Sequence, residues 1–595
     1  MAPHLASEER STRVPAHKQD SGFSLGIFAA GILAVLIGII YLFKTNPAVG
    51  RWAQGYDPTG KWWLSTAIAA LPILVLLGAM AVLRVKAHIA AISGLLTALI
   101  VAIAVFHMPA RLALSAAAYG AGYGLFPICW IIVPVIFLYD LTVKTGRFVT
   151  LQQSCTNITE DSRLQLLLIA YALGAFFEGT SGFGTPVAVC GAILISLGFR
   201  PLQAASLTLL ANTAPVAFGA LGTPIVALHG VTGLDTLTLS RLISILLVPF
   251  CMLVPFWLIW AYAGFRGMLE IWPAILLAGG TFAVSQYLMA AFVGPSLADI
   301  VAATSTIVVL IAFLRFWKPA RILNAAGKDV TGQRRERVDC STEDIFKAWL
   351  PWLVLSLIVF AWGYPPFSRW LDSFTTIKLT VAGLHNFIFR VPPVVAKPTA
   401  EAAVFTLNWL TATGTGIVVA AVIAGLLMGL GPITLAASFC KTIVNLRFTI
   451  VTIAAMLAIG YITRYCGLDA TLGLAFARTG ALYPFFGTLI GWLGTASTGS
   501  DTSANVLFGS LQTMTAQQIG VKPVLMASAN SAGGVMGKMI AAPSIVVATT
   551  ATQTYGQEGT ILRFVFLHSL ALASLVGVLV YLMAYVPPFT SLVGH

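Results

Sequence analysis

One polar, glycine-rich interruption of a long apolar run reads Glu178-Gly-Thr-Ser-Gly-Phe-Gly-Thr-Pro186, and a second reads Ser497-Thr-Gly-Ser-Asp-Thr-Ser-Ala-Asn505. Each combines glycines, hydroxyl side chains and one carboxylate. Hydrocarbon penalises unpaired backbone groups and charge, so such segments persist in a membrane only where they line a protein-enclosed, partly wet cavity. Two of them in one chain predict a polar site at membrane depth, which is what a solute transporter needs.

The composition places most of the chain in lipid. Of the 595 residues, 58% are hydrophobic and 9% are charged, and the mean hydropathy is +0.90. Soluble globular chains carry about 25% charged residues. Because one span takes roughly 20 residues, the apolar runs predict an all-α integral membrane protein with about 12 to 14 transmembrane helices.

The charged residues, cysteines and histidines exclude several other classes. The net charge of +13 does not indicate nucleic-acid binding, because the basic residues are spread over loops and helix ends. Their densest cluster, Arg315 to Lys347, is expected in the cytoplasm by the positive-inside rule. A topogenic loop is the simpler interpretation, and a regulatory or lipid-binding role is the alternative. Seven cysteines without a CxxC pair and eight scattered histidines predict no disulfide framework, no metal site and no cofactor.

The chain divides at changes in hydropathy. The apolar run 23–43 lacks the cleavage pattern of a signal peptide, so we expect a retained first helix. The predicted segments are a polar tail (1–22), a first transmembrane half (23–316) with a broken helix or re-entrant hairpin near 165–198, a basic cytoplasmic loop (317–346), a transmembrane helix (347–362), a proline-rich extramembrane excursion on the outer face (363–411), a second transmembrane half (412–586) with a hairpin near 483–512, and a C-terminal tail (587–595).

Two motifs recur in the same order in both halves. The stretch 180–189 aligns with 497–506, and 211–219 aligns with 529–537. The offset is 317 residues from Gly182 to Gly499 and 318 from Asn212 to Asn530. Corresponding interrupted segments in two halves are typical of the binding site of a transporter with inverted repeats. The alternative is that small-residue membrane helices resemble each other by composition.

The two carboxylates are the candidate proton-coupling residues. A charged group at membrane depth costs a few kcal/mol, so Glu178 and Asp501 must each hold a proton or have a partner. Glu178 could instead be a structural acid bonded to the hairpin backbone. Asp501 could cap a half-helix that begins near Thr502.

Glycines and short polar side chains let backbone N–H groups face a small anion. Lys538 and Arg464 are candidate counter-charges for that anion. The alternatives are hydrogen bonding between helices for the amides, snorkelling for Lys538, and an ion pair with Asp469 for Arg464. The candidate substrate-binding residues are Thr180, Ser181, Gly182, Gly184, Thr185, Asn212, Thr213, Ser500, Thr502, Ser503, Asn530, Ser531, Lys538 and Arg464.

The sequence contains no recognisable motif for ATP-driven transport or for enzymatic catalysis. The Gly182-Phe-Gly sequence is not a dinucleotide fingerprint, because no strand–helix unit surrounds it. The chain has no Walker sequence and no nucleophile–base set, so we expect a secondary transporter rather than a pump or an enzyme.

At its motifs the chain resembles the L-lactate permease family of bacterial monocarboxylate symporters, over most of residues 60–586. The resemblance implies proton-coupled import of L-lactate, D-lactate and glycolate across the inner membrane, with lipid as the surroundings and with no nucleic-acid partner. It leaves open whether the protein forms a homo-oligomer. The matching motifs lie at 174–186, 212–219, 499–505, 516–521 and 533–540, and weaker matches lie at 138–147 and 272–273.

The chain departs from the family pattern in two places. Thr180, Ser181 and Thr185 add hydroxyls where the family's first loop is usually rich in alanine, and Ala541-Ala-Pro-Ser544 replaces the usual Pro-Gln-Ser run. Both changes bear on the choice among short 2-hydroxy acids. A Na⁺-coupled or dicarboxylate transporter of similar architecture is the alternative, and a subunit of an ion-pumping membrane enzyme is a further one.

Overall fold

The computed structural model describes residues 50–81, 85–156, 158–180, 182, 184–331, 341–363, 365–395, 397–554 and 557–593. Helices dominate this part of the chain, and its strands are short. The predicted tail 1–22, the apolar run 23–43 and Ser181 lie outside the described residues.

The elements before the basic loop are almost all helical. The helices are α2 (Trp62–Ala81), α3 (Ala87–Ile100), α4 (Ala110–Tyr123), α5 (Trp130–Lys144), α6 (Arg147–Thr156), α7 (Ser162–Leu166), α8 (Gly174–Thr180), α9 (Thr185–Ser196), α10 (Pro201–Ala211), α11 (Gly219–Thr232), α12 (Thr236–Glu270), α13 (Trp272–Phe292) and α14 (Ala298–Phe316). The π-helical turns η1 (Val101–Val105), η2 (Gly124–Cys129) and η3 (Leu167–Leu173) and the 3₁₀ turn η4 (Val216–Phe218) join them.

The elements after the loop follow a similar plan. The helices are α15 (Thr342–Gly363), α16 (Pro365–Thr375), α17 (Thr413–Leu427), α18 (Pro432–Cys466), α19 (Leu468–Ala477), α20 (Tyr483–Thr498), α21 (Asp501–Gln518), α22 (Pro523–Gly537), α23 (Ala542–Ala551) and α24 (Glu558–Tyr585). The 3₁₀ turns are η5 (Gly480–Leu482), η6 (Lys538–Ile540) and η7 (Phe589–Val593).

Four of the five described strands lie in the segment predicted as an extramembrane excursion. They are β2 (Ile377–Thr380), β3 (Ile388–Arg390), β4 (Thr399–Ala400) and β5 (Val404–Leu407), and β1 (Trp52–Ala53) joins them from the start of the described chain. β2 pairs antiparallel with β5, and β3 lies between parallel β1 and antiparallel β4. Short paired strands and the prolines around them favour a small folded cap rather than a lipid-embedded segment.

Eight of the described helical segments are long and apolar enough to cross a membrane, or nine if the bent pair of α10 with η4 and α11 is one span. Large apolar side chains on them face outward: Ile100 is 64% exposed, Phe292 72% and Leu567 69%. Exposed apolar surface of this extent requires lipid around it. The predicted 12 to 14 spans exceed this count, because several apolar helices, such as α9, α17 and α19, are too short to cross alone.

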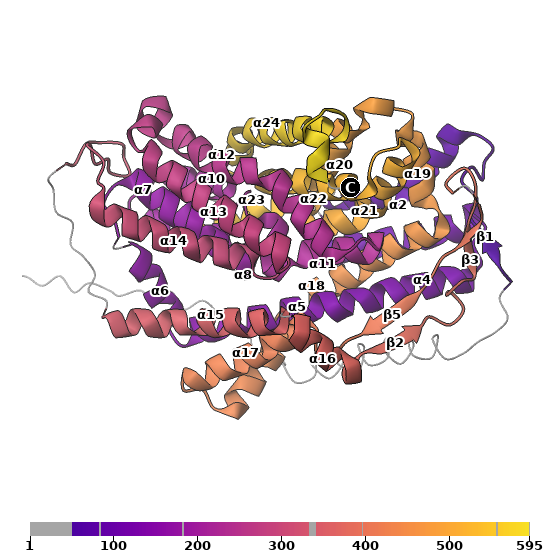
Figure 1. The fold of residues 1–595 in the computed structure, drawn as a ribbon, viewed down its shortest axis with the longest axis horizontal. Coiled ribbons are helices and arrows are strands. Elements are labelled where there is room, and N and C mark those ends of the chain that lie inside the picture. The colour runs from indigo at the N-terminus through magenta and orange to yellow at the C-terminus, as the bar shows by residue number, and fades with distance from the viewer. Residues whose placement is uncertain are drawn as a thin grey trace, which may run out of the picture.

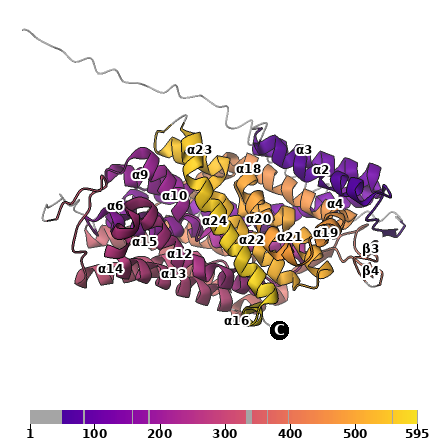
Figure 2. The same cartoon turned by 90° about the horizontal axis from the view of Figure 1, so that it is seen from above.

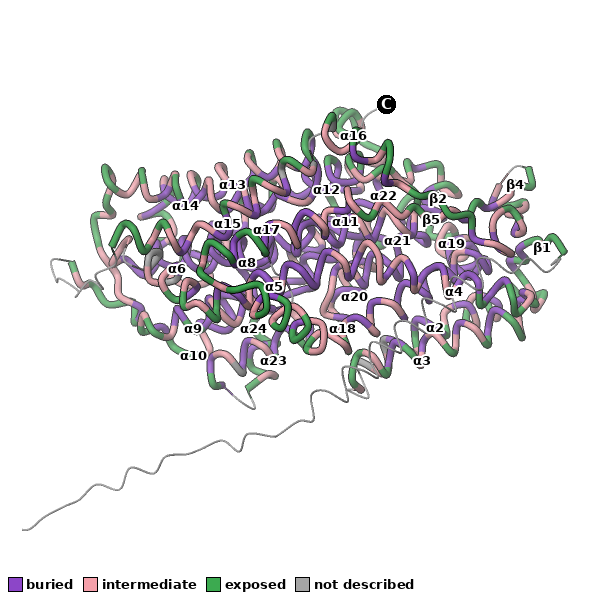
Figure 3. Tube along the Cα trace, turned by 90° about the horizontal axis from the view of Figure 1, so that it is seen from below, coloured by how far each residue is buried: buried purple, intermediate pink, exposed green. Residues whose placement is uncertain are grey.

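The helices form two groups along the longest axis (Figure 1). Most helices of the first half, from α6 to α14, lie toward one end, and α2 to α4 lie with α18 to α22 toward the other (Figures 1 and 2). The groups meet where α11 packs on α21 and α12 on α22, while α24 crosses over α20 and α22 (Figure 2). Buried residues run along this centre (Figure 3), where two apolar clusters adjoin.

Both polar stretches interrupt helices, as the sequence predicts. The break between α8 and α9 holds Gly182 at φ +60° and Gly184 at φ +85°, and the break between α20 and α21 holds Gly499 at φ +78°. Only glycine adopts such left-handed conformations without steric cost. Helical structure is continuous over 162–180 before the first break and over 501–518 after the second. The re-entrant course of these segments and an inverted relation of the halves stay predictions.

Close packing of α20 on α22 depends on glycines, and a Cβ on one of them, Gly537, would lie 2.2 Å from the carbonyl oxygen of Trp492. A methyl group on Gly491 would overlap the carbonyl oxygen of Asn530, and one on Gly533 would overlap that of Thr488. Contacts between backbones at small residues are how membrane helices associate. This contact fixes the position of α22 and therefore of the second polar motif.

Replacing Gly491 with alanine is therefore expected to destabilise the protein by about 1–3 kcal/mol, because the added methyl overpacks the contact. Thermal unfolding of the detergent-purified protein measures this effect. Gly280→Ala is the matched control, since a methyl there meets no atom within 4 Å. Equal melting temperatures for the two variants would contradict the predicted packing role.

Candidate functional site

Glu178 lies near the end of α8 and is buried. Its Oε2 accepts a hydrogen bond of 3.1 Å from Nδ2 of Asn212, in the second motif of the same half. Gly219, at the other end of that motif, lies against the carboxylate, and a Cβ there would come within 2.8 Å of Oε1. The first polar stretch and the motif 212–219 therefore enclose the carboxylate of Glu178. Its hydrogen bond comes from the side chain of Asn212 rather than from the hairpin backbone.

Asp501 is the first residue of α21 and is also buried. Its Oδ2 accepts hydrogen bonds from Ser531 Oγ at 2.6 Å and from Asn505 Nδ2 at 3.3 Å, and its Oδ1 accepts one from Thr495 Oγ1 at 3.4 Å. The alternative in which Asp501 caps this helix does not hold. Ser500 is the N-cap, and its hydroxyl accepts from the backbone N–H of Ser503 at 3.3 Å.

The same pairing of motifs therefore occurs in both halves. In each, an acid at a helix break is bonded by a polar side chain of the second motif, Asn212 in one case and Ser531 in the other. The two acids are not equivalent positions, however, because Glu178 precedes its break and Asp501 follows its own. The internal similarity holds for whole motifs rather than for single residues.

Lys538 is a buried cation near both carboxylates, although no ion pair within 4 Å joins it to either of these described side chains. Its side chain is only 7% exposed, and Nζ donates a hydrogen bond of 2.9 Å to the carbonyl oxygen of Gly499 in the second break. It also lies close enough to interact electrostatically with both Glu178 and Asp501. A buried ammonium in contact with a helix break argues against the alternative in which Lys538 reaches the membrane surface.

The remaining predicted residues surround this centre in different ways. Thr180 and Thr213 donate to carbonyls of their own helical turns, Phe177 and Leu210. Gly182 lies against Ala220 of α11 and Gly184 against Val547 of α23. Thr185 begins α9, and Thr502 and Ser503 lie in the first turn of α21.

Asn530 belongs to a buried polar network that the sequence interpretation did not include. Its Nδ2 donates to Asn505 Oδ1 at 3.0 Å, and its Oδ1 accepts from Gln512 Nε2 at 3.1 Å. Asn505 also donates to the carbonyl of Pro224 in α11, at 3.2 Å. The signal was available, since Asn505 follows Asp501 by one helical turn and therefore lies on its face of α21.

Asp299 is a third buried acid at the site, and the sequence interpretation missed it. It lies in the first turn of α14, where Oδ1 accepts from Gln286 Nε2 at 2.9 Å and Oδ2 has no hydrogen-bond partner. A Cβ on Gly179 would come within 2.7 Å of its Cβ, and it interacts electrostatically with Glu178. The criterion that selected Glu178, an acid inside an apolar run, would also have selected Asp299.

The charges do not balance if every group is ionised. Glu178, Asp299 and Asp501 could supply three negative charges, and Lys538 is the described cation that interacts with Glu178 and Asp501. An uncompensated charge in a membrane protein is costly. The arrangement therefore favours uptake of protons by the site.

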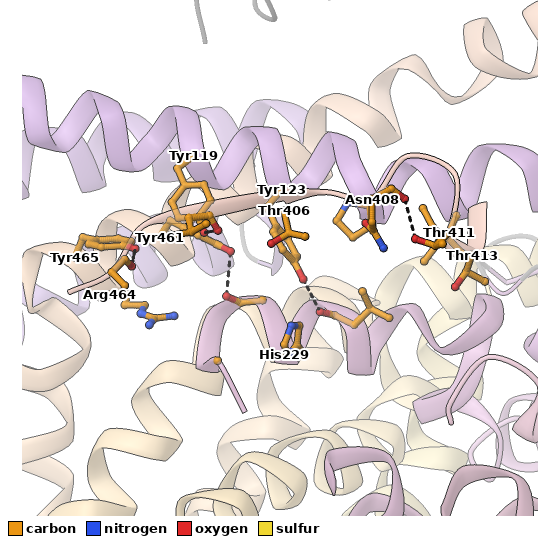
Figure 4. Close-up of a pocket in the computed structure, with 18 residues that line it drawn as sticks. Tyr119, Tyr123, His229, Thr406, Asn408, Thr411, Thr413, Tyr461, Arg464 and Tyr465 are labelled. Carbon is orange, nitrogen blue, oxygen red and sulfur yellow. Dashed lines mark hydrogen bonds between the residues drawn. The ribbon is translucent and has the colours of Figure 1, made fainter. Parts of the chain in front are cut away.

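Arg464 lies apart from Glu178, Asp501 and Lys538. At the end of α18 it donates to the carbonyl of Val231 at 2.9 Å and contacts Glu401 at 3.4 Å rather than pairing with Asp469. It lines a separate cavity of about 530 Å³ with several tyrosines (Figure 4). Among the described residues, no group of three or more His, Cys, Asp or Glu side chains is arranged to hold a metal ion.

Lipid-facing apolar helices around an enclosed polar centre define a multi-pass membrane transport protein. The family model for L-lactate permease matches residues 65–587, so the chain belongs to the L-lactate permease family.

Relatives are similar over nearly their whole lengths. The L-lactate permease of Salmonella typhimurium is 43% identical over 547 residues, which are 90% of this chain and 98% of that protein. The glycolate permease GlcA of Escherichia coli is 43% identical over 550 residues, with the same coverage. The L-lactate permease of Bacillus subtilis is 42% identical over 561 residues, or 90% of this chain and 99% of that protein.

The contact between Ser531 and Asp501 can be tested by a double-mutant cycle of stability. We expect Ser531→Ala to cost about 1–3 kcal/mol, because it leaves a buried carboxylate oxygen short of a hydrogen bond. In the Asp501→Asn background that cost should shrink, since the charge that strengthens the bond is gone. Ser574→Ala, at a serine that bonds within its own helix, controls for loss of a hydroxyl. Additive effects of the two site substitutions would show that the contact does not stabilise the fold.

Proposed function

We propose that this protein imports small 2-hydroxy monocarboxylates, L-lactate with D-lactate and glycolate, across the bacterial inner membrane together with a proton. The observation that carries the proposal is the burial of Glu178 and Asp501 at the two helix breaks, with the ammonium of Lys538 bonded to the carbonyl of Gly499 in the second break. Relatives named L-lactate permease and glycolate permease support the choice of cargo.

Coupling follows from the shortage of positive charge. When a substrate carboxylate pairs with Lys538, the carboxylates that the lysine had neutralised lose their counter-charge. A proton that binds to Glu178 or Asp501 restores the balance, so anion and proton are expected to bind together. Asp299 extends the acidic cluster beyond Glu178 and gives that proton a second buried carboxylate to occupy.

The helix breaks supply the rest of the anion site. Backbone N–H groups at the start of α21 are free of intrahelical partners and carry the positive end of the helix dipole. Lys538 donates a hydrogen bond to the carbonyl oxygen of Gly499, so its ammonium group lies at the start of α21. A small carboxylate between the ammonium and the N–H groups would satisfy both.

Energetically, one proton with one monoanion is electroneutral, so the membrane potential should contribute little. A pH difference of one unit is about 1.36 kcal/mol and supports roughly tenfold accumulation. Proteoliposomes with an alkaline interior and labelled L-lactate outside test the proposal directly. Uptake that requires Na⁺ and ignores the pH gradient would overturn it.

Glu178→Gln and Asp501→Asn are each expected to abolish accumulation driven by the pH gradient, because neither amide can gain a proton. Exchange of internal for external lactate should persist in at least one variant, since exchange needs no net proton movement. Asp329→Asn, at an exposed loop acid, is the control. Normal gradient-driven accumulation in both site variants would remove these residues from the coupling role.

Lys538→Gln is expected to raise the apparent KM for L-lactate by about tenfold or more, the loss typical of a hydrogen bond to a charged group. Lys538→Arg should recover part of the affinity. Lys522→Gln, at the exposed residue that precedes α22, is the matched control, because Lys538 directly follows the same helix. An unchanged KM in Lys538→Gln would restrict the lysine to a structural role.

A further inference from the structure

A second polar cavity lies away from the buried carboxylates and is partly open to solvent. We name it the arginine–tyrosine cavity. Its walls come from α4, η2, α5, α11 and α18 and from the segment that follows β4 (Figure 4). Its lining residues are Tyr119, Tyr123, Pro127, Ile131, Val226, His229, Gly230, Gly233, Ala402, Val404, Thr406, Asn408, Thr411, Ala412, Thr413, Tyr461, Arg464 and Tyr465, and its volume is about 530 Å³.

The wall of this cavity is positively charged. Arg464 is its one permanently charged lining residue, and no lining residue is acidic. Behind the wall, Glu401 pairs with both Arg464 and Arg390, so two guanidinium groups share one carboxylate there. The two terminal nitrogens of Arg464 donate to the carbonyl of Val231 and to Glu401, so the guanidinium is held in place at the wall. Asp469 is within electrostatic range of both arginines but does not line the cavity.

The tyrosines supply hydrogen-bond acceptors that complement the positive charge of Arg464. Tyr119 donates its hydroxyl hydrogen to the carbonyl of Val404 at 2.8 Å, Tyr461 to Gly230 at 3.0 Å, and Tyr465 to Ala402 at 2.7 Å. A phenol that has used its only hydrogen can still accept a hydrogen bond. The cavity therefore presents a cation for a carboxylate and phenolic oxygens for a hydroxyl group, which is the pair of groups in a 2-hydroxy acid.

Helix α11 connects this cavity to the buried centre. Val226 to Gly233, in its C-terminal half, line the cavity, while Gly219 at its start touches Glu178 and Pro224 accepts a hydrogen bond from Asn505. Pro224 and Gly230 are six residues apart, roughly 9 Å along a helix. An anion in the cavity is thus about one to two helical turns from the polar network of the site.

Five lining residues, Ala402, Val404, Thr406, Asn408 and Thr411, belong to the segment 363–411, which holds β2 to β5 and is predicted on the outer face. The described part of the basic loop, after α14, is at the opposite end of the long axis (Figure 1). Because basic loops remain in the cytoplasm, we take the face formed by segment 363–411 as the outer one, where an imported anion arrives.

We infer that the arginine–tyrosine cavity is an outer access site for a small 2-hydroxy monocarboxylate. The carboxylate binds Arg464 and the hydroxyl donates to a tyrosine oxygen before the anion moves along α11 to Lys538. This inference rests on the proposed function, and it adds a second recognition site that precedes proton coupling.

Uptake kinetics in right-side-out proteoliposomes test the inference, with L-lactate outside at fixed pH gradient. Removing the charge in Arg464→Gln should raise the external KM about tenfold, because a cleft of one sign concentrates its substrate by this order. The maximal rate should be retained, and Arg464→Lys should stay near the wild type. Wild-type KM should rise with ionic strength, whereas that of Arg464→Gln should respond weakly.

Two matched variants separate this role from a structural one. Glu401→Gln removes the carboxylate that competes for Arg464, so it should lower the external KM, opposite in sign to Arg464→Gln. Arg478→Gln removes an exposed charge that stacks on Trp62 outside the cavity, and it should change nothing. Propionate, which lacks the hydroxyl, should compete less well than lactate in the wild type and equally in Tyr461→Phe.

Three results would overturn the inference: an unchanged KM in Arg464→Gln, equal rises in Arg464→Gln and Arg478→Gln, or a loss of maximal rate in both Arg464→Gln and Glu401→Gln. Its failure is distinct from failure of the proposed function. If wild-type protein moves no lactate, the proposed function is wrong. If the wild type moves lactate and Arg464→Gln behaves identically, only the access site is wrong.

Discussion

The buried ammonium of Lys538 is the contact on which the rest of the site depends. It bonds the carbonyl that the second helix break exposes at Gly499 and lies within electrostatic range of Glu178 and Asp501. Without that cation, no described ammonium or guanidinium group would offset the charge of these carboxylates, and an uncompensated charge in a membrane protein is costly. The lysine can hold this position only because α20 and α22 approach at glycines, which places the end of α22 beside the break.

Glycine also determines where the acids can lie. Gly219 and Gly534 each back onto a carboxylate, and any side chain there would occupy the space of Glu178 or Asp501. The glycines of the two kinds of motif therefore have complementary roles. Those in the helix breaks let the chain turn, and those in the second motifs leave space for the acidic side chain. This explains why two separated motifs, rather than one, recur in each half.

Much of this arrangement follows from local sequence. The breaks could be predicted because glycine and hydroxyl residues interrupt apolar runs, and the recurrence of Asn212 and Asn530 pointed to the second motif. Asp299 was missed because it belongs to neither motif, although it is an acid in an apolar run. The alternative capping role of Asp501 does not hold, because Ser500 caps the helix instead. The environment of Arg464 could not be predicted, since its partner Glu401 comes from a segment without helical periodicity.

The two polar regions differ in what they can do to an anion, and that difference gives the proposed pathway a direction. The arginine–tyrosine cavity has a cation at its wall and no acid facing it, so it can attract a monoanion without a proton. The buried centre has more acids than cations, so under the proposed mechanism a monoanion enters together with a proton. Attraction at the first region therefore depends on salt, and occupancy of the second depends on protons. A transporter built this way selects its cargo by charge at the outside and delays coupling until the cargo is enclosed.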